Sequence, residues 1–185
     1  MLVDSHCHLN FPELLANLPA IKASMQANEV GHALCISVTL PDFPQVLALA
    51  ESSANFFASV GVHPDYENIE EPTVAGLLLL ADHEKVVAIG ETGLDYFRLT
   101  GDLEWQRTRF RTHIQAAIQC GKPLIIHTRN AAADTLRIMR EENVPLCIVD
   151  FVLVSATRLD GLDRCTARML KECIATNRRA NPTRR

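Results

Sequence analysis

The first residues of the chain contain side chains whose spacing suits metal binding. Asp4-Ser5-His6-Cys7-His8 follows a short apolar run. Because alternate residues of a strand share one face, Asp4, His6 and His8 are expected to point the same way. Two imidazoles at positions i and i+2 can hold one cation, and a neighbouring carboxylate can join or orient them. The segment therefore predicts a metal site at the end of a first strand.

Side chains that could complete such a site follow three later apolar runs: His63, Glu91 and His127. A carboxylate at Glu91 can bridge two cations, since each oxygen can bind one, and His127 would bind the second cation. Two cations about 3.5–4 Å apart can generate hydroxide and stabilise the leaving oxygen of a phosphodiester. Arg129 can hydrogen-bond a phosphate through its planar guanidinium, and His63 is placed to touch the substrate or the leaving group.

Each of these residues also has a purely structural interpretation. His63 could be a loop histidine bonded to backbone, and Glu91 a surface or helix-capping carboxylate. Asp95 could bond turn amides, and Arg129 could pair with a nearby carboxylate. The joint pattern favours the metal site, because ligand-type residues end four predicted strands in order. No role is predicted for the remaining histidines, His32, His83 and His113.

Short β-rich runs alternate with longer helical stretches. Strands are expected at 2–6, 33–38, 56–62, 86–90, 124–127 and 146–154, and helices at 14–28, 42–53, 72–82, 102–120 and 131–143. This alternation indicates βαβ units and a parallel sheet, either doubly wound or closed into a barrel. Ligand-type residues at the ends of many strands are typical of a barrel rim, and no Gly-x-Gly-x-x-Gly turn is present. We therefore expect an α/β fold, an incomplete (β/α)₈ TIM-type barrel with about five to six βα units.

Composition and charge divide the chain into two unequal parts. It has 185 residues, of which 48% are hydrophobic and 22% charged, enough for one domain with a real core. Residues 1–157 hold 10 Lys/Arg and 19 Asp/Glu, whereas residues 158–185 hold 8 and 3. The acidic body argues against broad electrostatic wrapping of nucleic acid, although cations could still meet phosphates locally. We expect a partial barrel domain at 1–154 and an atypical basic tail at 155–185.

The sequence also indicates a compartment. No apolar stretch reaches the length of a membrane span, and charged and polar residues interrupt any secretory signal at the start. The six cysteines are scattered without a Cys-x-x-Cys pair, as is typical of free thiols in a reducing environment. We expect a cytoplasmic protein without a membrane partner.

The motifs together resemble the TatD-like metal-dependent hydrolases, often described as deoxyribonucleases. The resemblance covers roughly residues 1–144, and its order and spacing both fit. It implies a barrel with a two-metal site for Mg, Mn or Zn that acts on DNA phosphodiesters, with ligand roles for His6, His8, Glu91 and His127. The matching segments are 4–8, 61–64, 90–96, Gln106 with Phe110, and 126–129.

The resemblance weakens after Val144. Members of the family look as if they continue with a His-Cys-Phe strand and later a Glu-Thr-Asp segment that supply further ligands, and neither motif is present here. Asp150 is the one candidate ligand left in a strand-like context. We therefore expect residues from about 145 onward to be foreign to the family, through a frameshift, a gene-model error or alternative splicing. The open edges of an incomplete barrel would then favour poor solubility or self-association.

Two other functions stay open. The chain could be an inactive fragment that binds metal without turnover. It could also be a metal-dependent amidohydrolase acting on amide or ester bonds, since barrels with a strand-1 His-x-His do that chemistry. Such enzymes usually carry a carboxylated lysine on strand 4, where this chain has Glu91, and Lys85 and Lys122 do not lie at predicted strand ends.

Overall fold

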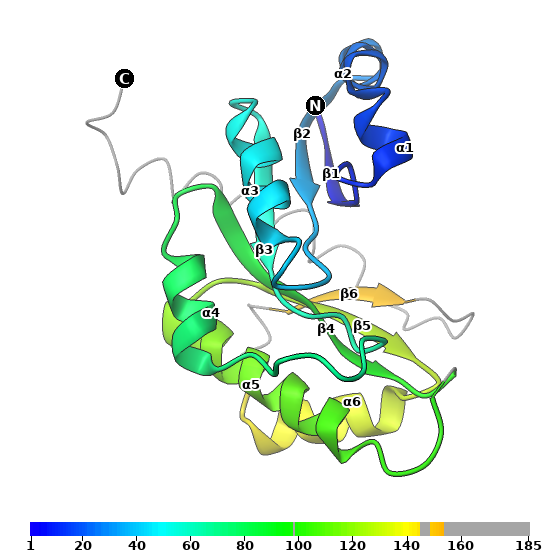
Figure 1. The fold of residues 1–185 in the computed structure, drawn as a ribbon, viewed down its shortest axis with the longest axis vertical. Coiled ribbons are helices and arrows are strands. Elements are labelled where there is room, and N and C mark those ends of the chain that lie inside the picture. The colour runs from blue at the N-terminus through cyan, green and yellow to red at the C-terminus, as the bar shows by residue number, and fades with distance from the viewer. Residues whose placement is uncertain (98, 145–148, 154–185) are drawn as a thin grey trace.

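The fold is a curved parallel sheet with helices on its outer side (Figure 1). The computed structural model describes residues 1–97, 99–144 and 149–153. The strands are β1 (Leu2–Cys7), β2 (Val30–Cys35), β3 (Phe56–Val60), β4 (Val86–Asp95), β5 (Leu124–Arg129) and β6 (Val149–Leu153). The helices are α1 (Pro12–Leu15), α2 (Leu18–Ala27), α3 (Phe43–Glu51), α4 (Val74–Ala81), α5 (Glu104–Cys120) and α6 (Ala132–Glu141).

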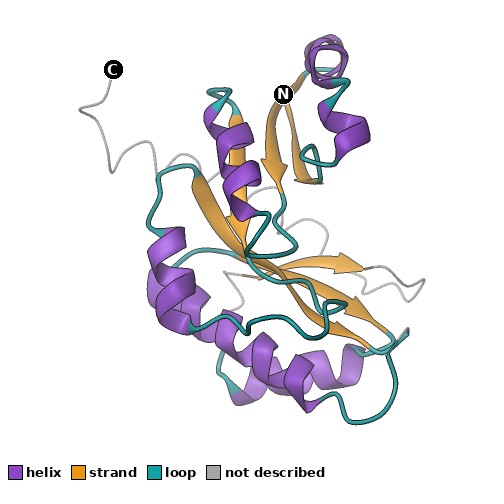
Figure 2. Cartoon of the chain, in the orientation of Figure 1, coloured by secondary structure: helices purple, strands orange, loops and turns teal. Residues whose placement is uncertain are grey.

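The six strands pair strictly in sequence order, and every pair is parallel. A doubly wound sheet would reverse its order at a switch point, whereas a (β/α)₈ barrel keeps the order throughout. Figure 2 shows the sheet curling through the molecule with α4, α5 and α6 along its outer side. Among the described residues β1 and β6 form the two edges of the sheet.

Side chains on the two faces of the sheet form separate apolar clusters. Helix residues such as Phe43 and Phe110 pack with strand residues such as Phe56 in the larger cluster, between the sheet and the helices. The smaller cluster contains strand residues and Ile36, which directly follows β2, but no helix residue, so it lies on the inner face. Ile125 belongs to this inner cluster, and His127, two residues further along β5, therefore shares its face.

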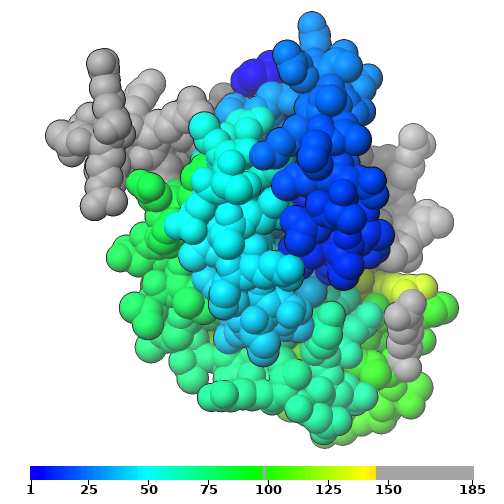
Figure 3. Space-filling view, turned by 45° about the horizontal axis from the view of Figure 1, so that its top comes forward, coloured from blue at the N-terminus to red at the C-terminus, as the bar shows by residue number. Residues whose placement is uncertain are grey.

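The N-terminal helices differ from the prediction. One helix was expected over 14–28, but α1 ends at Leu15 and α2 begins at Leu18. Pro19 causes the break, because proline lacks the N–H that a helix interior needs and is tolerated only in a first turn. In Figure 3 these helices (blue) and α3 (cyan) lie side by side on the surface. The Lys22 Nζ of α2 donates to Ser53 Oγ, just after α3, at 2.6 Å.

Strand β4 is longer than predicted. Its predicted end was Gly90, yet it continues to Asp95 and pairs with β5 up to the Asp95–Arg129 level. Gly93 and Asp95 are typical turn residues, which is why the sequence suggested a turn here. The carboxyl half of β5 supplies backbone partners that no local pattern reveals. Glu91 and His127 therefore lie inside their strands, with two or more strand residues beyond each of them.

The predicted sixth strand is present at Val149–Leu153, where it pairs with β5. Its register sets Val152 beside His127 and Asp150 beside Ile125. The predicted basic tail at 155–185 lies outside the described residues. No helix of the described residues is long and apolar enough to cross a membrane.

Substitution of Gly93 can test how closely β4 and β5 are paired. Its φ is 131°, and a Cβ added there would lie 2.1 Å from the carbonyl oxygen of His127. We expect Gly93→Ala to lower the free energy of unfolding by more than about 2 kcal/mol, because a paired strand must move away. Gly121→Ala is the matched control, since Gly121 also has a positive φ (66°) but no atom within 4 Å of an added Cβ. Gly121→Ala should lower the free energy of unfolding by roughly 1 kcal/mol. Equal losses for both variants in urea denaturation would contradict this account.

Candidate metal centre

The buried carboxylate of Glu91 lies between two pairs of histidines. Its Oε2 is 3.2 Å from His6 Nε2 and 4.0 Å from His8 Nε2. Its Oε1 is 3.3 Å from His127 Nδ1 and 3.8 Å from His63 Nε2. Only 3% of the Glu91 surface is exposed. Each oxygen of one carboxylate thus faces its own pair of imidazoles.

Four different strands bring these side chains together. His6 lies in β1 with His8 just after it, Glu91 in β4 and His127 in β5, while His63 follows β3. The backbone also supports this assembly, because the His63 N–H donates to Val38 O and the Glu91 N–H donates to Ser37 O. Parallel strands end on the same side of a sheet, so residues far apart in sequence meet at one rim.

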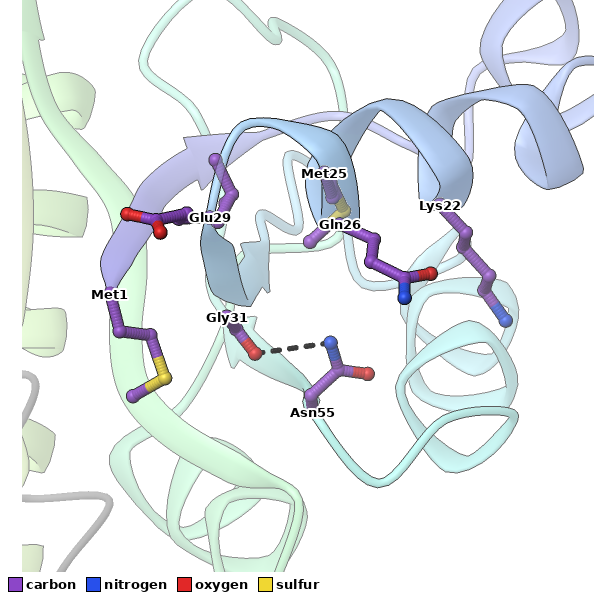
Figure 4. A pocket seen from close by; sticks show the side chains of 8 residues that line it. Met1, Lys22, Met25, Gln26, Glu29, Gly31 and Asn55 are labelled. Carbon is purple, nitrogen blue, oxygen red and sulfur yellow. Dashed lines mark hydrogen bonds between the residues drawn. The ribbon is translucent and has the colours of Figure 1, made fainter.

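The side chains surround an open cavity of about 610 Å³. Arg129, Tyr66 and Phe11 line it together with the cluster around Glu91. A second cavity, of about 580 Å³, lies by the amino-terminal ends of β1 and β2, where Met1, Met25 and Lys22 face it (Figure 4). In the described part of the chain, the two groups of side chains able to hold a metal ion are both at the first cavity. Within the described residues, the side chains able to bind metal are therefore concentrated at this cavity.

Asp95 fixes the orientation of the His127 ring. Asp95 Oδ2 is 3.0 Å from His127 Nε2, and Asp95 Oδ1 accepts the Phe97 N–H at 2.8 Å. Burial alone would raise the pKa of Asp95, but the Phe97 N–H and His127 lower it, so the carboxylate stays charged. An ionised Asp95 accepts the Nε2 proton of His127, so Nδ1 is the atom that faces Glu91: it donates to Glu91 when it is protonated, and its lone pair is available to a cation when it is not.

Electrostatics keeps Glu91 ionised and His63 neutral. Burial would raise the pKa of Glu91, but hydrogen bonds with His127 and His6 hold it well below its ordinary range. Burial lowers the pKa of His63 to about 4, and it also lowers the pKa of His8. For His127 the burial effect is outweighed by Glu91 and Asp95, which raise its pKa. At neutral pH the cluster thus offers a carboxylate and at least two neutral imidazoles.

This donor set fits divalent cations. The ligand atoms of His6, His8 and Glu91 lie within 4.8 Å of one another, and so do those of His63, Glu91 and His127. The Nε2 atoms of His6 and His8 are the ring atoms that face Glu91, and imidazole nitrogens together with a carboxylate are ligands that divalent transition cations accept.

Most of the predicted site residues therefore meet in one place. His6, His8, Glu91 and His127 converge as expected, and His63 lies closer than expected, with its Nε2 3.1 Å from His127 Nδ1. Arg129 lies at the rim rather than in the cluster. Asp4 does not join, because its Oδ1 accepts the His6 backbone N–H and its side chain is exposed. The side chain of Asp150 lies outside the described residues.

The supporting role of three α5 residues was not predicted from the sequence, although Gln106 belonged to the matching segments. The inner face of α5 bonds the backbone of residues 62–66, which carries His63. Gln106 Nε2 donates to Pro64 O, Arg109 Nη1 donates to His63 O and Tyr66 O, and His113 Nε2 accepts the Val62 N–H. We call Gln106, Arg109 and His113 the α5 clamp. Their spacing of three and four residues fits one face of a helix, but the backbone groups that they bond lie more than 40 residues away in the sequence, and His113 received no role.

A sequence model of the family described as TatD-related DNase matches residues 3–158. The chain belongs to this family. It is 41% identical over 149 residues to an uncharacterized metal-dependent hydrolase, YcfH, of Escherichia coli K12, covering 79% of this chain and 56% of that protein. It is 31% identical over 131 residues to a 3′-5′ ssDNA/RNA exonuclease TatD of Enterobacter lignolyticus, covering 70% and 50%.

Among solved structures, the TatD homologue YjjV of Escherichia coli K12 superposes with a TM-score of 0.75 at 25% identity. The match covers 93% of this chain and 65% of YjjV. These comparisons confirm the resemblance and the incomplete TIM-type barrel. The chain spans little more than half the length of YcfH. The family match continues to residue 158, past the point near 145 where foreign sequence was expected to begin.

Asp95 can be tested through the ring that it holds. Because a charged Asp95 raises the pKa of His127 against the effect of burial, Asp95→Asn should lower that pKa. The measurement is an NMR pH titration of the His127 ring in the metal-free chain. Asp102→Asn is the control, since Asp102 is exposed and lies in the loop before α5. An unchanged His127 pKa in Asp95→Asn would refute the assigned contact.

The α5 clamp can be tested by stability. Gln106 is fully buried, and its side chain also accepts the Asp95 N–H at 3.0 Å. Gln106→Leu leaves that N–H and the Pro64 carbonyl without partners, so we expect a loss of about 2–3 kcal/mol in unfolding free energy. Gln115→Leu, on the exposed side of the same helix, should change it by less than about 0.5 kcal/mol. Similar urea midpoints for the two variants would show that the clamp contributes little.

Proposed function

We propose that this chain carries a two-cation site that hydrolyses phosphodiester bonds of nucleic acid, with DNA as a substrate. The observation that carries the proposal is the bridging position of Glu91, each of whose oxygens faces a separate pair of imidazoles. Such a carboxylate can hold two ions at the short separation that two-metal phosphodiesterases use, about 3.5–4 Å.

In this proposal His6, His8 and Glu91 would hold one cation, and His127 and Glu91 would hold the other. His63 would contact the substrate or the leaving group, and Arg129 would bind a phosphate oxygen. The bound cations supply charge neutralisation on the phosphate and acidify water. Asp95 keeps the Nδ1 lone pair of His127 directed inward throughout. Imidazole and carboxylate together suit Mn²⁺ or Zn²⁺, and Mg²⁺ is the third candidate.

The nucleic-acid substrate is supported by the relative described as a 3′-5′ ssDNA/RNA exonuclease. The free thiols of Cys7, Cys35 and Cys120 are in keeping with a reducing, cytoplasmic environment. The barrel domain at 1–154 would carry the whole of the proposed cluster. The basic tail at 155–185 is a separate segment in this proposal.

The amidohydrolase alternative is disfavoured by the positions of two lysines. Lys85 Nζ donates to the carbonyls of Ser53 and Phe56, at 2.7 and 3.0 Å. Lys122 Nζ donates to Val86 O at 2.6 Å and also to Ala81 O. Both ammonium groups are thus bonded to backbone away from Glu91. A carboxylated lysine that bridges two ions would have to stand where Glu91 stands.

Glu91→Gln tests the proposed site with minimal change of shape. We expect calorimetric titration with Mn²⁺ to give two ions bound per wild-type chain, and cleavage of a single-stranded oligonucleotide to depend on them. The variant removes the bridging charge, so metal affinity and cleavage should each fall about 100-fold or more. Glu51→Gln is the control, because Glu51, the last residue of α3, is half-exposed and pairs with His83 away from the site.

The two measurements separate the remaining alternatives. Metal binding without cleavage by wild type would support the inactive-fragment function. Cleavage that survives Glu91→Gln unchanged would remove the proposed site altogether. Hydrolysis of amide or ester substrates in preference to phosphodiesters would revive the amidohydrolase alternative.

A further inference from the structure

Two exposed aromatic side chains, Phe11 and Tyr66, line the cavity that holds Glu91, and a third, Phe97, stacks on Arg129, which also lines it. Phe11, Tyr66 and Phe97 are 36, 38 and 56% exposed, and we call them the aromatic rim. Phe11 stacks on His8 with ring centroids 5.0 Å apart and planes 14° apart, and Tyr66 meets His63 edge-on at 6.4 Å. Each ring thus touches a residue of the cavity while much of its own surface faces solvent.

The ring of Phe97 stacks against the guanidinium of Arg129. The Arg129 guanidinium carbon lies 3.6 Å from the centre of the Phe97 ring. Arg129 lines the cavity and forms no ion pair within the described residues, so the alternative that it pairs with a nearby carboxylate does not hold there. Stacking uses the face of the guanidinium and leaves the N–H groups at its edge available to a phosphate. One face of the Phe97 ring meets Arg129, and its 56% exposure leaves the other side open.

A ligand that matches this arrangement carries flat rings and anions side by side. Unpaired nucleotides have both, since each base offers a π face and each linkage a phosphate. Bases inside a duplex are stacked on one another and cannot lie on a protein ring without being unpaired first. Aromatic platforms beside a phosphate-binding arginine are therefore typical of sites for single strands.

We propose that Phe97 and Arg129 form a nucleotide subsite, in which an unpaired base stacks on Phe97 while its phosphate binds Arg129. This deepens the proposed function and rests on it. Phe11 and Tyr66 extend the same rim on the other sides of the cavity. The subsite selects single strands over duplexes and is indifferent to base identity, because stacking needs only a flat ring. It accepts DNA and RNA alike, since the sugar is not part of either contact.

The test removes the Phe97 ring from the protein and, separately, the bases from the nucleic-acid ligand. The full chain in Mn²⁺ is titrated with two phosphorothioate single strands that resist hydrolysis, one with normal bases and one with abasic sites. Wild type should bind the base-bearing strand about tenfold or more tightly, as stacking of one base predicts. Phe97→Ala should lose this preference, and Phe97→Tyr should retain it because the ring remains. Leu79→Ala, at an exposed position on α4, is the matched control and should behave as wild type.

Three results would refute the subsite. If Phe97→Ala still prefers the base-bearing strand as wild type does, or if wild type binds both strands equally or binds neither, the subsite is refuted. A DNA strand and an RNA strand of the same sequence should give similar preferences, and a strong preference for one sugar would also refute it. Cleavage of bis(p-nitrophenyl) phosphate, which has no base, reports the proposed phosphodiesterase separately. That activity should be present in wild type and equal in Leu79→Ala, so its absence in wild type would count against the proposed function rather than the subsite.

Discussion

The arrangement of the cavity depends on one buried carboxylate that remains charged. Removing Glu91 from water opposes its ionisation, and the imidazoles on both sides reverse that effect. The carboxylate in turn gathers rings from four strands that share no local sequence. A neutral side chain of the same size would leave those rings without a common partner. The curvature of the sheet matters to the chemistry mainly because it brings β1 and β5 to opposite sides of this group.

A second layer of contacts keeps the rings in place. Asp95 holds His127, and the α5 clamp holds the backbone on which His63 stands. Gln106 joins both parts, because its amide bonds Asp95 on one side and Pro64 on the other. Helix α5 therefore does more than cover the sheet. Its buried polar residues hydrogen-bond the backbone beside Asp95 and His63 and so fix where these two side chains lie.

The sequence was enough to predict the parallel βα architecture and the convergence of His6, His8, Glu91 and His127. Both follow from periodicity and from the rule that parallel strands end at one rim. Three features could not be read in this way. The split between α1 and α2 depends on Pro19 at a position where a continuous pattern was also possible. The extension of β4 needs pairing with β5, and the roles of Asp95 and His113 need contacts across 32 and 51 residues. Such long-range hydrogen bonds leave no periodic signal in the chain.

The strictly sequential pairing of the strands has a consequence for biosynthesis. Each strand pairs with the one made before it, and within the described residues the cluster around Glu91 consists of residues at or before position 127. A nascent chain can therefore bring these described residues together once β5 has left the ribosome. The order of translation and the order of assembly coincide, so an ion could be captured while synthesis continues.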